Sequence, residues 1–263
     1  MSNKITIPKK SKYLAEETGI HMGDGYMKIR KDVWGVHYEY AYSGHAHDDE
    51  DYIKYVKLLM KKLYNLNPGY ERLTNENGFN MSYFSKNLTN FKLSIGLPLS
   101  PKNNLEIPKW IKNNEEFSKN FLRGLFDTDG CLTFKGKNEN LHNYPYITLG
   151  LKNRKFIYEL GDLLKKFSFD LNICKHYKIA SNGTRTITWD IGLSGKDNLL
   201  KYMKDIGFNN SKHITKYLIW MKFGFCPPHT TLKQRKEILS DKLDPLLLEK
   251  VPRGRFERPI TAL

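Results

Sequence analysis

Two short segments of the sequence end in the same way, and this repetition limits the fold more than any other feature. Residues 16–27 read EETGIHMGDGYM, and residues 121–134 read FLRGLFDTDGCLTF. Both run from a helix-like stretch into an aspartate and a glycine. The aligned positions are Gly19 with Gly124, Ile20 with Leu125, Asp24 with Asp129, and Gly25 with Gly130. Two copies of one helix end predict two copies of one structural unit.

The similarity continues downstream of both segments. YIKYVKLLMKKL at 52–63 aligns with FIYELGDLLKKF at 156–167, and both have the apolar spacing of an amphipathic helix. NLTNFKLSIGL at 87–97 aligns with NLLKYMKDIGF at 198–208. We therefore predict a duplication. It consists of a first repeat in residues 1–105, a linker and second repeat in residues 106–225, and a C-terminal extension and tail in residues 226–263.

The segments between these helices are predicted to be strands. YMKIRK, YPYITLGLK and TRTITWDIGLS are rich in β-branched and aromatic residues. Each repeat then reads helix, strand, strand, helix, strand, strand, helix, which gives an α+β fold of two pseudo-symmetric units with antiparallel sheets. The two motif helices are expected to pack at the centre, because glycine lets helix backbones approach closely. The glycines available for this contact are Gly19, Gly23 and Gly124.

The charge of the chain predicts a polyanionic partner. Lys and Arg number 43 against 28 Asp and Glu, so the net charge is +15. Nucleic acid is favoured over an anionic membrane, since no apolar run is long enough to cross a bilayer and the first residues lack an apolar signal core. Three scattered cysteines indicate a reducing compartment, the cytoplasm of a prokaryote or an organelle matrix.

Acids at the centre of so basic a chain require an explanation. If the motif helices lie side by side, Asp24 and Asp129 face each other near the pseudo-two-fold axis. Two carboxylates that close repel unless a cation lies between them. Hard divalent cations prefer oxygen ligands and bridge to phosphate. The sequence therefore predicts a divalent metal, Mg²⁺ with Mn²⁺ as the alternative, held by these aspartates and supported by the backbone at Gly25 and Gly130.

The motif itself resembles that of a known family. LRGLFDTDG at 122–130 resembles the LAGLIDADG motif. ETGIHMGDG at 17–25 is a degenerate copy in which Met22 stands where the first aspartate would be. The positions of the second copy that agree with the motif are Leu122, Gly124, Leu125, Asp127, Asp129 and Gly130. The chain is thus similar to the single-chain, two-motif LAGLIDADG homing endonucleases.

The resemblance implies a fold, an activity and a partner. The fold is two αββαββα units whose sheets lie along the major groove of duplex DNA, where base edges are distinguishable. The activity is metal-dependent hydrolysis of both strands at a long target site, leaving short 3′ overhangs. Asp24 and Asp129 are the implied metal ligands and catalytic residues. A monomer is expected, because one chain already holds both halves, and the protein is expected to be encoded within an intron.

Basic residues are harder to assign. By the resemblance, Lys152 at the end of a strand in the second repeat is the expected catalytic lysine, and the first repeat has no lysine at the matching place. The unequal copies predict unequal cleavage of the two strands. The residues expected to contact DNA as a group are Arg30, Lys135, Lys175, Lys178 and Arg185.

Several alternatives remain open. An RNA-binding maturase acting on its own intron, or a DNA-binding regulator that no longer cuts, would use the same fold. A basic structural protein would leave the paired acids unexplained, and an intein is disfavoured by the terminal Met and Leu. The segment HAHDDED at 45–51 could hold metal, but acids that begin a helix are the favoured interpretation. The C-terminal extension could contact DNA or brace the fold.

Overall fold

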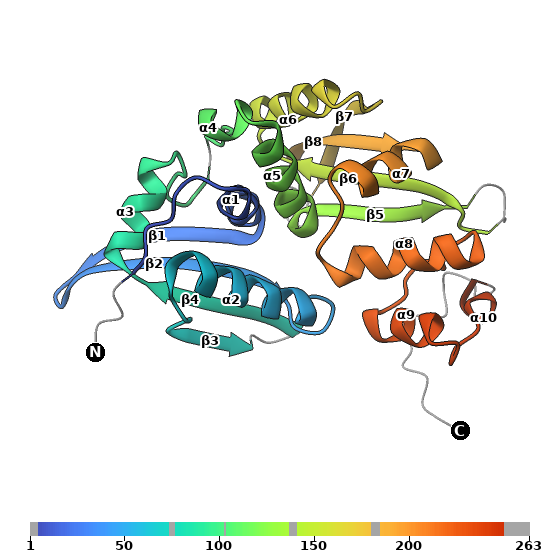
Figure 1. Cartoon of the computed structure of the whole chain (residues 1–263), viewed down its shortest axis with the longest axis horizontal. Helices are drawn as coiled ribbons and strands as arrows, with labels where there is room; N and C mark the ends of the chain where they lie inside the picture. Colours follow the sequence, from blue (N-terminus) through green and yellow to red (C-terminus); the bar gives the residue numbers. More distant parts are fainter. Residues whose placement is uncertain (1–4, 74–76, 103, 137–140, 180–184, 250–263) are drawn as a thin grey trace.

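The chain forms two α+β units that lie side by side (Figure 1), in a computed structural model that describes residues 5–73, 77–102, 104–136, 141–179 and 185–249. The first unit consists of α1 (Lys12–Asp24), β1 (Gly25–Asp32), β2 (Gly35–His45), α2 (Glu50–Tyr64), β3 (Tyr70–Leu73), β4 (Gly78–Phe84) and α3 (Lys86–Ser94). Its strands form an antiparallel sheet in the order β1-β2-β4-β3.

The second unit repeats this order. After the short helix α4 (Lys109–Lys112), it consists of α5 (Glu115–Thr128), β5 (Gly130–Lys135), β6 (Tyr144–Leu151), α6 (Arg154–Lys166), β7 (Asn172–Ile179), β8 (Arg185–Ser194) and α7 (Lys196–Asp205). The sheet order is β5-β6-β8-β7, again antiparallel. The predicted α+β fold of two αββαββα units is therefore confirmed.

Each sheet buries one face against helices and leaves the other face polar. Helix α3 packs on the first sheet, and α6 and α7 pack on the second. Strand side chains alternate between faces, and the helix-covered faces carry buried apolar residues that form one core shared by both units. Examples are Met27, Tyr40, Met81, Leu132, Ile147 and Ile191. These helices leave the opposite faces uncovered.

Helices α1 and α5 form the contact between the units. Each begins at a side-chain cap: Ser11 Oγ accepts from Leu14 N at 3.3 Å, and Asn114 Oδ1 accepts from Phe117 N at 2.9 Å. A Cβ at Gly19 would lie 2.1 Å from the Phe121 carbonyl oxygen. No side chain fits there, so the two backbones touch directly.

The C-terminal helices connect the second unit to the first. They are α8 (Ser211–Phe223), α9 (Leu232–Leu239) and α10 (Pro245–Glu249). At the start of α9, Leu232 N donates to Asp48 Oδ1 at 3.0 Å, and Lys236 pairs with Asp51 at 2.7 Å. The extension therefore contacts both units. In the described residues, no helix combines the length and apolar character needed to cross a membrane.

Candidate active site at the ends of the central helices

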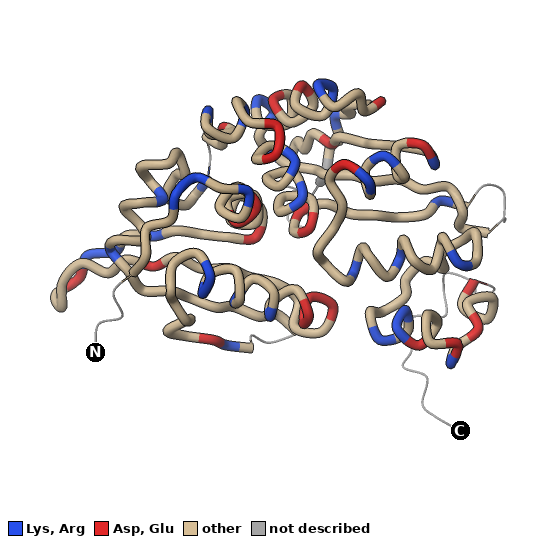
Figure 2. Tube along the Cα trace, in the orientation of Figure 1, with Lys and Arg blue, Asp and Glu red and all other residues tan. Residues whose placement is uncertain are grey.

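The two motif aspartates lie at the same end of the central helix pair. Asp24 is the last residue of α1, and Asp129 is the C-terminal cap of α5, where its N–H donates to Leu125 O at 3.0 Å. A Cβ at Gly23 would lie 3.4 Å from Asp129 Cγ, so the end of α1 is packed against the Asp129 carboxyl group. Figure 2 shows acidic residues where both helices end.

The glycines of both motifs mark where helix becomes strand. Gly25 is the first residue of β1, and Gly130 is the first residue of β5. A Cβ on either glycine would meet the last turn of its own motif helix, His21 in one case and Phe126 in the other. The chain can therefore leave each helix directly as a strand, with the aspartate at the corner.

The electrostatics of this corner disfavour charge on the carboxylates. The pKa of Asp24 is raised to about 7, mainly by burial and also by the nearby Asp129 and Asp49 carboxylates, against the opposing effect of Lys212 and Lys102. Burial also raises the pKa of Asp129, again against the two lysines. Each aspartate thus lies in a site where a cation would stabilise the ionised form.

Lys102 comes from the segment after α3 and lies at the end of α1. Its Nζ donates to three backbone carbonyls, those of His21 at 3.0 Å, Met22 at 2.8 Å and Gly23 at 2.7 Å. These are carbonyls of the last helical turn, which otherwise lack partners and carry the negative end of the helix dipole. Burial lowers the pKa of Lys102, while Asp129 and Asp24 raise it.

Lys212 lies in the corresponding place in the second unit. Its Nζ is 3.5 Å from Thr128 O, at the end of α5, and 3.2 Å from Asp49 Oδ1. Burial alone would raise the pKa of Asp49, but Lys212 and Asn210 hold it below its ordinary value. The site therefore contains the two motif carboxylates and two ammonium groups, with one of each from each repeat, and Asp49 lies beside them, paired with Lys212.

These lysines were missed in the sequence, although a signal exists. The third aligned segment ends with Ile95-Gly96 in the first repeat and Ile206-Gly207 in the second, and a lysine follows soon after each pair. Lys152, the predicted catalytic lysine, lies exposed just after β6. Among the charged side chains that the structure describes, those acting on Asp129 are Lys102 and Lys212. The structure does not bring Lys152 to the aspartates.

Comparison with known proteins agrees with this geometry. Residues 116–207 match the profile of a LAGLIDADG-like domain. The chain also superposes on mesophilic variants of the homing endonuclease I-DmoI, with a TM-score of 0.51 and 14% identity over 74% of this chain and 95% of that one. It has the LAGLIDADG fold. The predicted family resemblance is confirmed.

A second relative covers more of the chain. The LAGLIDADG meganuclease I-AabMI, solved bound to uncleaved DNA, aligns over 93% of this chain and 100% of its own, with 13% identity and a TM-score of 0.51. No curated protein sequence gives a significant match. At these identities the structural relatives establish the LAGLIDADG fold and not the activity of this chain.

The donor set at this corner fits a divalent cation. Asp24 and Asp129 offer oxygen ligands, and the Asp129 carboxylate makes Asp24 harder to ionise. In the described residues, they belong to no group of three or more His, Cys, Asp or Glu side chains that could form a protein cage. Mg²⁺ is commonly held by one or two carboxylates, with water and phosphate oxygens completing its coordination. The two aspartates therefore suit a metal shared with a phosphate.

The other acids of the motif region have structural partners. Asp127 accepts hydrogen bonds from the backbone N–H of Asn209 at 3.0 Å and of Asn210 at 3.0 Å. Burial raises its pKa to about 8, and these N–H groups oppose the rise. In the 45–51 segment, Asp49 occupies the N-cap position of α2, and its carboxylate accepts from His45 N and Asn210 Nδ2. Glu50 and Asp51 lie in the first turn of the helix.

The strand register divides the predicted DNA-contacting residues between two faces. Arg30 lies on the polar face of the first sheet, where Nη2 is 2.9 Å from Glu39 Oε2, and Lys135 lies on that of the second, 3.5 Å above the Tyr146 ring. Lys175 pairs across from Trp189, on the helix side. Arg185 lies on the helix side as well, because every second residue of β8, including Ile187 and Trp189, faces that side. The side chain of Lys178 lies outside the described part.

Proposed function

We propose that the chain is a site-specific endonuclease that makes metal-dependent double-strand cuts in a long duplex DNA target. The observation that carries this proposal is the meeting of Asp24 and Asp129 at one corner, with Lys102 and Lys212 acting on both. A protein that only binds DNA gains nothing from buried acids that repel phosphate. Metal-assisted hydrolysis of a phosphodiester uses carboxylates to hold the metal and nearby cations to offset the charge that develops.

Each residue has a distinct role in this proposal. The aspartates hold the metal, which when bound polarises the phosphate and lowers the pKa of attacking water. Lys102 and Lys212 neutralise charge that develops on the phosphate in the transition state. Their attachment to the ends of α1 and α5 holds the ammonium groups in position before DNA arrives, so little reorganisation is needed during the reaction.

The sheets would deliver the DNA to this corner. The polar face of each sheet carries polar and charged side chains and would follow one half of the target in the major groove. I-AabMI is described as bound to uncleaved DNA, and an I-DmoI variant of TM-score 0.52 as bound to its target DNA with manganese present. The net charge of +15 would supply the sequence-independent part of the affinity.

The test is cleavage of a randomised duplex-DNA library with Mg²⁺ by the wild type, Asp24→Asn and Asp129→Asn. The exposed Asp162 on α6 provides a matched control, Asp162→Asn. We expect cuts at one long site with short 3′ overhangs, retained in the control and lost in both site variants. Salt-sensitive duplex binding without cutting would indicate a regulator instead. Preference for intron RNA over duplex DNA would indicate a maturase.

A further inference from the structure

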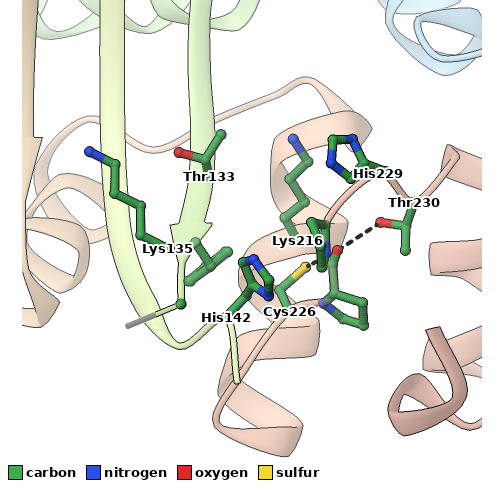
Figure 3. A pocket seen from close by; sticks show the side chains of 11 residues that line it. Thr133, Lys135, His142, Lys216, Cys226, His229 and Thr230 are labelled. Atoms are coloured by element: carbon green, nitrogen blue, oxygen red, sulfur yellow. Dashed lines mark hydrogen bonds between the residues drawn. The ribbon is translucent and has the colours of Figure 1, made fainter. Parts of the chain in front are cut away.

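A cavity of about 620 Å³ lies between strand β5, helix α8 and the segment that leads into α9 (Figure 3). It is separate from the aspartates at the helix ends. Among the described residues that line it, two are lysines, two are histidines and none is an acid. The polar and sulfur-containing lining residues are Thr133, Lys135, His142, Lys216, Cys226, His229 and Thr230.

The first wall of the cavity is the free edge of β5. This strand is at the end of its sheet, so the edge carbonyl and N–H of Leu132 need other partners. Lys216 Nζ donates to Leu132 O at 2.9 Å, and Leu132 N donates to His213 Nδ1 at 3.4 Å. The bond from Lys216 to Leu132 O uses one of the three hydrogens of the ammonium group and holds that group beside the cavity.

Several polar side chains that line the cavity point to one side. Figure 3 shows the tips of Thr133, Lys135, Lys216 and His229 directed to the same side. Lys135 is held over the Tyr146 ring at 3.5 Å, and Thr133 Oγ1 donates to Tyr146 O at 3.3 Å. Donors from two separate elements therefore line one cavity, and no carboxylate is among its described lining residues, an arrangement suited to an anion.

A further positive charge lies behind the cavity wall. Arg235 of α9 is only 2% exposed, and its guanidinium donates to the backbone oxygen of Thr230 and to Thr215 Oγ1. Glu249 is bonded to His142, 2.5 Å from its Nδ1. Burial raises the pKa of the Cys226 thiol to about 12, so this residue is no nucleophile. The net charge around the cavity is positive.

We propose that this cavity binds a phosphate of the DNA backbone at the outer part of the second half-site. The inference rests on the proposed function, because Thr133 and Lys135 belong to the sheet face that would follow the DNA. A DNA strand that follows this face would next reach Lys216 and the 226–230 segment. The C-terminal extension thereby lengthens the DNA interface, in addition to joining the two units.

The test uses the full chain and the variants Lys135→Ala and Lys216→Gln. Lys165→Ala is the matched control, because Lys165 is exposed on α6, which covers the opposite face of the sheet. Affinity for the selected duplex is measured at several salt concentrations. Loss of one phosphate contact reduces the slope of log K against log salt by about 1 and weakens binding about three- to tenfold at physiological salt.

We expect both site variants to show these losses with unchanged preference among target sequences, and the control to match the wild type. Ethylation of one outer phosphate should weaken wild-type binding and leave Lys216→Gln unaffected. Equal affinity and salt slope in all four proteins would overturn the proposal. If the wild type binds no duplex, the proposed function fails. Inorganic phosphate followed by NMR then tests the cavity alone: binding lost in Lys216→Gln supports an anion site, and no binding refutes it.

Discussion

The ends of α1 and α5 each bring one aspartate and one lysine together, but different contacts hold the two lysines. At the end of α5, Asp127 accepts hydrogen bonds from the backbone at the start of α8, just before Lys212. At the end of α1 the matching residue is the buried Met22, which offers no such bond. Lys102 instead attaches itself to three carbonyls of α1. The segment that carries Lys212 is held by the Asp127 carboxylate, whereas Lys102 is held by its own hydrogen bonds to the end of α1.

The difference shows which motif positions the site depends on. The first aspartate can be replaced when another group orders the lysine segment. The last aspartate is retained at both helix ends, and so are the glycines where the two backbones touch. The two halves are therefore chemically equivalent at the carboxylates and different in their supporting contacts. Five predictions use this comparison.

The largest effect is expected from inserting a side chain where the two helix backbones touch. Gly124→Ala places a Cβ 2.1 Å from the Glu16 carbonyl oxygen, and Gly19→Ala does the same at Phe121. Backbone cannot move away as a side chain can, so we expect each change to lower the free energy of unfolding by about 3 kcal/mol or more. Urea unfolding measures this. The control Gly44→Ala, whose Cβ would have its nearest neighbour at 3.6 Å, should change stability little.

The second prediction separates the two lysines. Lys102→Met and Lys212→Met should each lower the rate of cleavage about 10²- to 10³-fold, because each removes a cation from the transition state. Since the lysines are anchored differently, the two variants should affect the two strands unequally. Strand-specific labels on the duplex reveal which strand is nicked first. Identical time courses for both strands in both variants would show that the halves are equivalent.

The third prediction concerns pH and metal. With its pKa raised to about 7, Asp24 in the folded, metal-free chain holds a proton that metal must displace. Affinity for Mn²⁺ should therefore rise about tenfold per pH unit below pH 7 and level off above it. Calorimetric titration at pH 5.5, 6.5 and 7.5 measures this. A flat profile would mean that Asp24 is already ionised.

The same shift affects stability. Because the folded chain binds this proton more tightly than the unfolded chain, whose Asp24 has an ordinary pKa of 3.8, Asp24 makes the metal-free protein less stable as the pH rises from about 4 to 7. Asp24→Asn should remove that part of the decline. A decline of the same steepness in the variant would place its cause in other groups, such as Asp127.

The smallest effect concerns the two faces of the sheets. Arg30→Ala should weaken duplex binding about tenfold, since Arg30 lies on the polar face. Lys175→Ala should change it less than about twofold, because Lys175 lies on the helix side over Trp189. Fluorescence anisotropy with the selected duplex compares the two. A larger loss from Lys175→Ala would show that the DNA follows another path.

The sequence predicted the duplication, the element order and the pairing of Asp24 with Asp129, because each depends on a local pattern that occurs twice. It did not predict Lys102 or Lys212. Their positions depend on the segments after α3 and α7, which fold back to the helix ends from residues 81 and 84 positions away. A periodic pattern in the sequence does not show that a distant segment will fold back onto a helix end.

A second surprise was the degenerate first motif. Glu17 stands where the motif has an apolar residue, yet it is fully buried. Its carboxylate pairs with the buried Lys92 and accepts from the hydroxyls of Tyr40 at 2.5 Å and Tyr64 at 3.0 Å. Buried charge is tolerated only when it is paired and hydrogen-bonded. The partners come from three different elements, so the motif alone could not show why an acid is accepted there.

The central claim is that each motif helix supplies one ligand to a shared metal centre. The most direct test is an anomalous difference map from crystals of the chain with a selected duplex and Mn²⁺. The account predicts peaks beside both Asp24 and Asp129, between the helix ends and the DNA backbone, and none beside an aspartate that is changed to Asn. Manganese bound only in the 45–51 segment, or absent from both aspartates in a crystal that contains DNA, would contradict it.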